Sequence, residues 1–180
     1  MAKKIIAFGA STSTNSINKQ LAEHAIKQLT AIEANLLDLN DFELPLYSID
    51  LETESGIPEN AMKFRQMIRD SDGVMVSLAE HNGLYTSAFK NLWDWMSRIE
   101  NPKVWEDQPV LLLGTSPSRR EESNVMKVSQ QLFPLFGAKI VSSYHLPSFH
   151  HFFKDGQIIE AAQQEKFAAA ITEFEAHINR

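Results

Sequence analysis

The chain has 180 residues, of which 43% are hydrophobic and 22% are charged, and its formal net charge is −6. This length suits one domain with one sizeable core, so we expect residues 1–180 to form a single domain. The acidic balance argues against an extended nucleic-acid interface, which needs a basic surface. Because the sequence has no cysteine, disulfides, thiolate nucleophiles and cysteine-based metal sites are excluded.

The amino terminus places two lysines before an apolar run, as a secretory signal peptide does. The run covers only residues 5–10 and ends in Ser11 and Thr12, which is shorter than the usual hydrophobic region of about 7–15 residues. No apolar stretch approaches the roughly 20 residues of a membrane span. We therefore expect a cytoplasmic protein with no membrane partner.

Short apolar runs alternate with helical patterns along the chain. The runs that predict strands cover residues 4–8, 34–39, 73–78, 110–114 and 139–143. The helical patterns cover residues 17–29, 58–68, 89–99, 121–136 and 160–178, while residues 42–58 read as a loop. This alternation predicts an α/β, flavodoxin-like fold with a five-stranded parallel sheet, order 2-1-3-4-5, and helices on both faces. Ligands of such sheets bind beyond the carboxyl ends of the strands, where the strand order reverses.

Several single residues sharpen these expectations. Pro58 fits the first turn of a helix, and Gly137 fits a helix C-cap. Pro134 lies inside a predicted helix and is expected to bend its last turn. Trp93 and Trp95 point to different faces of one helix, so we expect Trp93 in the core and Trp95 at a subunit contact.

The loop after the first strand is rich in hydroxyl groups. The span from Ser11 to Thr14 carries four of them, and Ser16 is positioned to cap the following helix. A helix amino terminus has unpaired N–H groups, and hydroxyls around it can satisfy phosphate oxygens, so we interpret this loop as an anion site. The alternative is that these residues only cap the helix and form a turn. The loop matches neither the dinucleotide fingerprint GxGxxG nor the phosphate loop GxxxxGK[ST].

The loops after the third and fourth strands complete the predicted crevice. Residues 79–83 contain the turn signal Asn82-Gly83, and their backbone groups can read the polar edge of a planar ring. His81 lies near the face of such a ring or is an ordinary exposed histidine. Residues 114–118 form the opposite wall. The following Arg119 and Arg120 either attract the phosphates of a nicotinamide cofactor or begin a solvated helix.

Three histidines, His145, His150 and His151, lie close together in the sequence. Three histidines can bind zinc, but no carboxylate accompanies them at ligand spacing. We therefore expect no metal site and interpret this segment as a loop at a subunit or active-site edge.

Two segments resemble the NAD(P)H-dependent FMN reductase family, which includes quinone and azo-compound reductases. Residues 10–18 align with the family pattern GSxRxxSxN, with Ala10 in place of glycine and Ser13 in place of arginine. Residues 79–98, AEHNGLYTSAFKNLWDWMSR, are similar to PEYNxxxPxxLKNxxDWxSR. The matching positions of the second segment are Glu80, Asn82, Lys90, Asn91, Asp94, Trp95, Ser97 and Arg98.

The resemblance implies FMN as cofactor and NADPH or NADH as electron donor. It implies phosphate contacts, through side chain or backbone, from Ser11, Ser13, Ser16, Ile17 and Asn18. It implies flavin-ring contacts from Ala79, Glu80, His81, Asn82 and Gly83, and further contacts from Ser116 and Pro117. His81 stands for a tyrosine of the family, and Ser118 follows Pro117 where the family usually has glycine.

The implied activity passes hydride from a nicotinamide to FMN and electrons on to a small-molecule acceptor, namely a flavin, quinone or azo compound. No side chain serves as nucleophile or acid–base catalyst in this interpretation. Family members commonly form dimers, so we expect a homodimer or homotetramer. The alternatives are a flavodoxin-like electron carrier and an FMN-binding protein, neither of which oxidises nicotinamides.

Overall fold

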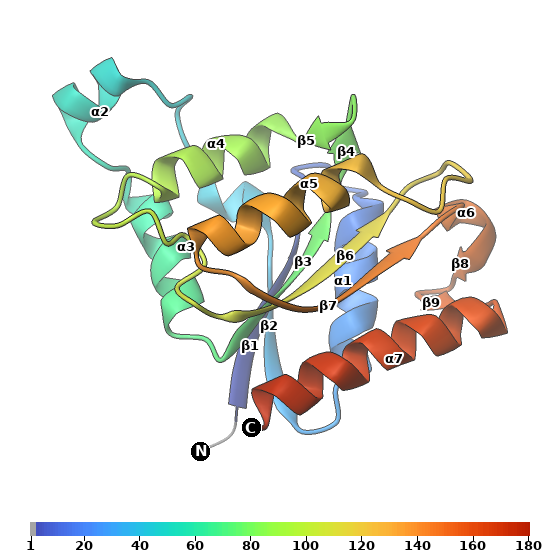
Figure 1. Cartoon of the computed structure of the whole chain (residues 1–180). Helices are drawn as coiled ribbons and strands as arrows, with labels where there is room; N and C mark the ends of the chain where they lie inside the picture. Colours follow the sequence, from blue (N-terminus) through green and yellow to red (C-terminus); the bar gives the residue numbers. More distant parts are fainter. Residues whose placement is uncertain (1–2) are drawn as a thin grey trace.

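The computed structural model describes residues 3–180. Its centre is a parallel sheet of five strands in the order β2-β1-β3-β6-β7 (Figure 1). The strands are β1 (Lys3–Gly9), β2 (Ile32–Leu37), β3 (Gly73–Leu78), β6 (Pro109–Thr115) and β7 (Lys139–Leu146). When only the five strands of this sheet are numbered in chain order, their order is 2-1-3-4-5. The predicted flavodoxin-like α/β architecture is therefore confirmed.

Helices cover both faces of the sheet (Figure 1). One face carries α1 (Ile17–Lys27) and α7 (Ala161–Ile178), and the other carries α3 (Glu59–Arg69), α4 (Ser87–Met96) and α5 (Asn124–Leu132). Alternate residues of β1 enter opposite cores, because successive side chains of a strand point to opposite faces. Ile5 packs in the core beneath α1 and α7. On the other face Phe8 packs edge-on against Phe64, with the two ring centroids 5.1 Å apart. Within residues 3–180, no helix has the length and apolar composition needed to cross a membrane.

Several element ends differ from the sequence prediction. Strand β2 ends at Leu37, two residues early, because the Asp38 side chain caps a 3₁₀ helix, Leu39–Phe42. Helix α5 begins only at Asn124, where the Ser123 hydroxyl accepts a hydrogen bond from the Met126 N–H. The predicted bend at Pro134 is a switch to a 3₁₀ helix, Phe133–Phe136, which ends on Gly137 in the left-handed conformation (φ 89°).

Short elements that were not predicted interrupt the loops. Residues 42–58 contain α2 (Ile49–Ser55), which projects from the body of the molecule (Figure 1). Two hairpins, β4 (Glu80–His81) with β5 (Leu84–Tyr85) and β8 (Phe153–Lys154) with β9 (Gln157–Ile158), and the short helix α6 (Phe149–Phe152) complete the fold.

The expectation for Trp95 was wrong. Its side chain is fully buried, its Nε1–H donates to the Pro45 carbonyl at 2.8 Å, and the Tyr47 ring packs edge-on against it at 5.0 Å. The segment before α2 therefore covers Trp95 within the same chain. Trp93 lies in the core as expected.

Candidate functional site

Three loops meet where the strand order reverses. They follow β1 (residues 10–16), β3 (residues 79–86, including the β4–β5 hairpin) and β6 (residues 116–123). Because β1, β3 and β6 are neighbours and parallel, their carboxyl ends bring these loops to one edge of the sheet. This is the edge at which the sequence predicted the crevice.

The first loop leaves several of its backbone amides without an acceptor. The Ser11 hydroxyl accepts a hydrogen bond from the Ser13 N–H at 3.1 Å, and the Ser16 hydroxyl caps α1 by accepting from the Lys19 N–H at 3.2 Å. Among the described residues no acceptor exists for the amide N–H groups of Thr12, Thr14, Asn15, Ile17 and Asn18. Unpaired amides at a helix amino terminus form an anion site, so this loop suits a phosphate.

The donors available in this loop are N–H and hydroxyl groups rather than a free cation. The lysine next to the loop, Lys19, is paired with Asp38, and this hydrogen bond and that from Asn40 hold the pKa of Asp38 below its ordinary value. Ser13 occupies the position of the family's arginine and is exposed. A phosphate here would be held by N–H and hydroxyl donors.

Helix α1 lies against the end of β1 without any space for a side chain on Gly9. A Cβ atom at Gly9 would lie 2.5 Å from the Lys19 backbone nitrogen and 2.9 Å from the Asn18 carbonyl carbon. Contacts this short between backbone atoms require the helix to move. Gly9 therefore fixes how closely α1 and the first loop approach the sheet.

The Asn18 side chain faces the sheet rather than the loop. Its Oδ1 accepts from the Ser77 hydroxyl at 2.9 Å and from the Thr115 N–H at 3.1 Å, and its Nδ2 donates to the Thr115 carbonyl at 3.4 Å. Asn18 is almost fully buried. Its side chain thus ties α1 to the ends of β3 and β6, and only its backbone N–H remains for an anion.

Thr86, which the sequence prediction missed, connects the second loop to the first. It is the N-cap of α4, and its buried hydroxyl donates to the Ala10 carbonyl at 2.8 Å. The signal for it was the N-cap preference of threonine ahead of an apolar helical pattern.

The β4–β5 hairpin presents backbone groups at the crevice. Asn82 and Gly83 form its turn with φ of 52° and 84°, as a tight Asn-Gly hairpin turn requires, so this turn prediction is confirmed. Ala79 is buried beneath the hairpin and His81 is exposed on it. His81 therefore has space to approach a ligand.

Glu80 joins the second loop to the third. Its Oε2 accepts from the Ser123 hydroxyl at 2.9 Å and from the Val125 N–H at 3.2 Å, and Arg120 lies 3.5 Å from its Oε1. Burial alone would raise the pKa of Glu80, but these hydrogen bonds and the arginine outweigh burial and lower it. The side chain thus holds the start of α5, and its backbone remains the part available to a flavin.

Replacing Glu80 with glutamine should lower the free energy of unfolding by about 1 kcal/mol at pH 7, because hydrogen bonds to a carboxylate are lost. A carboxyl whose pKa is lowered in the folded state stabilises above its unfolded pKa, and this stabilisation is lost as pH falls through the lowered value. The difference between Glu80→Gln and the native protein should therefore shrink below about pH 4.

Urea unfolding at pH 7 and at acid pH measures this difference. Glu54→Gln is the matched control, since Glu54 is exposed on α2 and has no hydrogen-bond partner among the described residues. A difference for Glu80→Gln that stays constant with pH would contradict this prediction.

The third loop forms the far wall of a crevice of about 160 Å³. Ser116 and Pro117 line it together with Glu80 from the second loop. The Ser116 hydroxyl lies 3.1 Å from that of Ser118, so the serine in place of the family glycine is part of the loop's own hydrogen bonding.

The histidines do not gather at one point. His145 lies on β7 and lines the crevice, with its Nδ1 buried and unpaired, and burial lowers its pKa. His150 and His151 are exposed on α6. No group of three potential metal ligands occurs within residues 3–180.

The family model of the NADPH-dependent FMN reductases matches residues 3–151, a range that contains all three loops. The chain belongs to this family. A 2-hydroxy-1,4-benzoquinone reductase from Burkholderia sp is 37% identical over 116 residues, which are 64% of this chain and 62% of that relative. The match thus spans less than two thirds of the relative's length.

Solved structures agree with the fold of an FMN reductase family member. FerB, a flavoenzyme NAD(P)H:(acceptor) oxidoreductase from Paracoccus denitrificans, has a TM-score of 0.77 at 23% identity, covering 97% of this chain and 98% of that one. Oxidised flavodoxin 1 from Bacillus cereus has a TM-score of 0.61 at 17% identity, covering 97% and 98%. At these identities the likeness concerns the fold alone.

Proposed function

We propose that this member of the NADPH-dependent FMN reductase family is an NAD(P)H-dependent FMN oxidoreductase whose acceptor is a small quinone, flavin or azo compound. The observation that carries the proposal is the group of unpaired amides of Thr12, Thr14, Asn15, Ile17 and Asn18. They lie at the switch point of a chain that matches this family. The quinone class is supported by the benzoquinone-reductase relative.

The residues present fit FMN. The amides of Ile17 and Asn18, with the hydroxyls of Ser11, Ser13 and Ser16, would hold its phosphate. The backbone of residues 79–83 and of Ser116 and Pro117 would border its ring. Bound FMN would supply the hydride-accepting ring, and the chain supplies binding and orientation.

The loops would position the ring through the hydrogen bonds that join them. Thr86 holds the second loop against Ala10 of the first, and Glu80 holds it against the third. These bonds join the first loop to the second and the second to the third, and the crevice itself is lined by Glu80 and by the third loop. Such rigid placement favours transfer between two bound partners.

Anaerobic mixing of FMN-loaded protein with NADPH or NADH tests the proposal. We expect the visible absorbance of the flavin to fall after the nicotinamide is added and to return after a benzoquinone is added. Protein that binds FMN but is not bleached by either nicotinamide would instead be an electron carrier of the flavodoxin kind, a function that the hydroxyl-rich first loop also suits. A colourless protein that takes up no added FMN would exclude both functions.

We further propose that residues 1–180 act as one FMN-binding domain in a cytoplasmic homodimer or homotetramer. The exposed apolar residues Leu46 and Ile49, beside and within the projecting α2, support a subunit contact there. Sedimentation equilibrium measures the assembly, and a monomer would contradict this part of the proposal.

A further inference from the structure

A buried histidine lies in the helix that follows the first loop and has no part in the proposed function. His24 is in α1 and is only 4% exposed. Its Nε2 atom is buried and has no hydrogen-bond partner within residues 3–180, and the same holds for Oε1 of Gln164 on α7. Buried polar groups are nearly always hydrogen-bonded, so this unpaired imidazole is an exceptional feature of the core.

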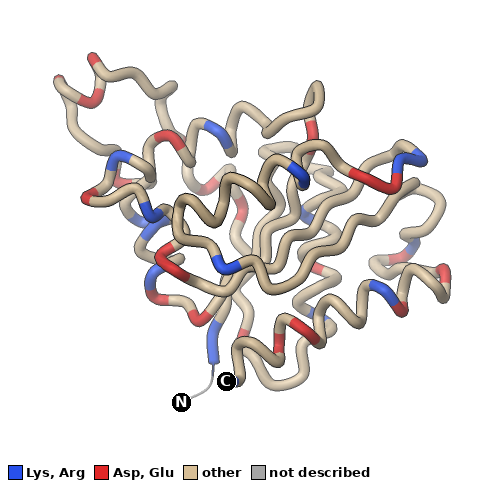
Figure 2. Tube along the Cα trace, in the orientation of Figure 1, with Lys and Arg blue, Asp and Glu red and all other residues tan. Residues whose placement is uncertain are grey.

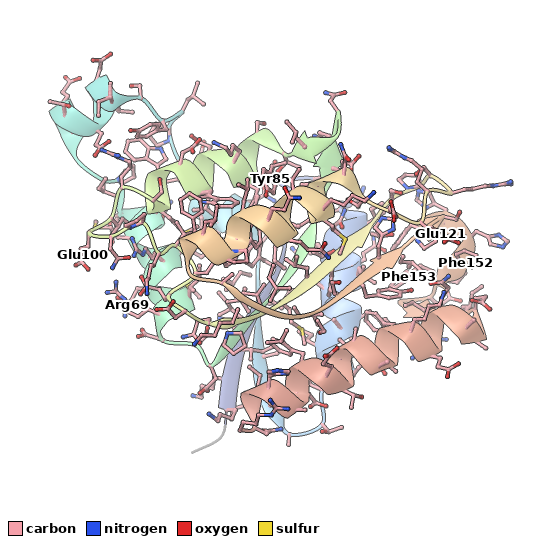
Figure 3. All side chains as sticks on the ribbon, viewed as in Figure 1. Arg69, Tyr85, Glu100, Glu121, Phe152 and Phe153 are labelled. Carbon is pink, nitrogen blue, oxygen red and sulfur yellow. The ribbon has the colours of Figure 1, made fainter. Side chains whose placement is uncertain are left out.

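Aromatic rings connect His24 to the segment after β7. The imidazole stacks on Phe167 of α7, with the ring centroids 4.9 Å apart, and meets Phe153 of β8 edge-on at 5.6 Å. Phe153 in turn stacks on Phe149 of α6 at 4.6 Å. Figure 3 shows Phe153 at the end of the molecule where the loop after β6 also lies. Residues 148–158, here termed the latch segment, therefore pack onto α1 through the His24 ring.

The latch segment is also hydrogen-bonded to the third loop of the candidate site. The Ser148 N–H donates to the Ser118 carbonyl at 2.7 Å, and the Phe149 N–H donates to the Ser116 carbonyl at 3.0 Å. Ser116 and Ser118 line the crevice. The latch segment thus joins His24 to a wall of the proposed flavin site.

The surroundings of His24 disfavour a proton on its ring. The groups that face it from the hairpin and from α7 are uncharged, namely Phe153, Gly156, Gln164 and Phe167. Burial lowers the pKa of His24 more than Gln164 and Gly156 raise it, and the positive charge of Lys27 lowers it as well.

The charged residues of the same elements are directed elsewhere. On α1, Lys27 is paired with Glu23. Glu160, at the start of α7, accepts hydrogen bonds from backbone N–H groups of its own first turn. Lys154 and Asp155 of the hairpin are exposed next to its turn (Figure 2). None of these side chains offers a carboxylate to the buried Nε2 of His24.

Protonation of His24 therefore opposes the folded packing. A histidine whose pKa is lowered in the folded state contributes stability that is complete above its unfolded pKa of about 6.5 and is lost as pH falls below that value. The attraction between an imidazolium and the face of Phe167 is weaker than the cost of burying an unpaired charge. Of the elements around His24 the hairpin is the easiest to displace, because its two-residue strands form a sheet of their own whereas α1 and α7 pack on the central sheet.

We propose that His24 is an acid-sensitive latch, whose protonation releases residues 148–158 from α1, loosens the third loop and weakens the binding of FMN. Only the last step, the effect on FMN, rests on the proposed function. Because coupling between two sites is reciprocal, bound FMN also makes His24 harder to protonate.

Hydrogen exchange of the protein without FMN, followed by NMR, tests the release. As pH falls from about 7.5 to about 5.5, we expect the Ser148 and Phe149 amides to lose protection about tenfold, in step with titration of the His24 ring. Amides of β3, which report global unfolding, should keep their protection. His24→Phe retains a ring without a titrating proton and should keep Ser148 and Phe149 protected at both pH values. His24→Gln, which is also neutral, repeats this test with a smaller side chain.

Titration of FMN by fluorescence quenching at the same two pH values tests the coupling. Between them the native protein should lose about fivefold more affinity than His24→Phe does. The other titrating groups, including the phosphate of FMN, are common to both proteins, so their effects cancel in this comparison. His151→Phe is the matched control, because it removes an exposed histidine from the latch segment, and it should lose affinity as the native protein does.

A His24 ring that stays neutral until the protein unfolds in acid would overturn the inference. Loss of protection at Ser148 and Phe149 only together with the β3 amides would also overturn it, and so would equal losses of FMN affinity in the native protein and His24→Phe. These outcomes are separable from those of the proposed function. Protein that takes up no FMN at any pH refutes the proposed function, and hydrogen exchange still decides whether the latch opens.

Discussion

Replacing Gly9 with valine is expected to abolish FMN binding and to lower the free energy of unfolding by about 3 kcal/mol. Any Cβ at this position meets the backbone of Lys19 at 2.5 Å, and backbone atoms of a helix cannot rotate away as a side chain can. The first turn of α1 must therefore move as a unit. That movement displaces the unpaired amides of the anion loop.

Urea unfolding followed by tryptophan fluorescence, together with flavin titration, measures both effects. Gly156→Ala is the control, because Gly156 has a positive φ of 79° but no atom within 4 Å of an added Cβ. Gly156→Ala should lower the free energy of unfolding by about 1 kcal/mol, because of the backbone conformation alone, and should leave the affinity for FMN unchanged. A Gly9→Val protein that binds FMN as the native protein does would show that the close contact is not what positions the loop.

Replacing Asn18 with alanine should lower the free energy of unfolding by about 3 kcal/mol, even in protein without FMN. The change leaves the Ser77 hydroxyl and the Thr115 N–H without their acceptor in a buried place, and each such group costs about 1–3 kcal/mol. Helix α1, which follows the first loop, also loses its link to β3 and β6. We therefore expect weaker FMN binding in addition to lower stability.

Ser77→Ala provides the matched comparison, because it removes one of these hydrogen bonds and leaves that from the Thr115 N–H in place. Its expected cost is about 1 kcal/mol. Denaturation of the two single variants and the double variant measures the coupling between the residues. A cost for Asn18→Ala no larger than that for Ser77→Ala would mean that the Thr115 bond contributes nothing.

The sheet was predictable from sequence because its strands are buried on both faces and therefore appear as short apolar runs. Residues 73–78 were placed without error, since every residue of β3 is buried. The positions of the site loops followed from strand order alone. Helix ends were harder, because capping side chains such as Thr86 and Ser123 decide them and similar residues occur in every loop.

The roles of the polar side chains were not predictable, because their partners lie far away in the chain. Asn18 bonds to Thr115, 97 positions later, and Glu80 bonds to Ser123, 43 positions later. Sequence patterns of a family mark such residues without telling whether they touch the ligand or hold the site together. Trp95 was misplaced for the same reason, since its partner Pro45 precedes it by 50 positions.

The hydrogen bond from the Thr86 hydroxyl to the Ala10 carbonyl joins two protein groups, and so does the bond from the Thr115 N–H to Asn18. These bonds do not involve the flavin, so we expect the loops to keep their arrangement without it and loop ordering to take little of the binding free energy. Binding to such a preformed pocket should proceed with a small change in heat capacity and no refolding of the loop. We therefore expect FMN to dissociate and rebind without unfolding the protein.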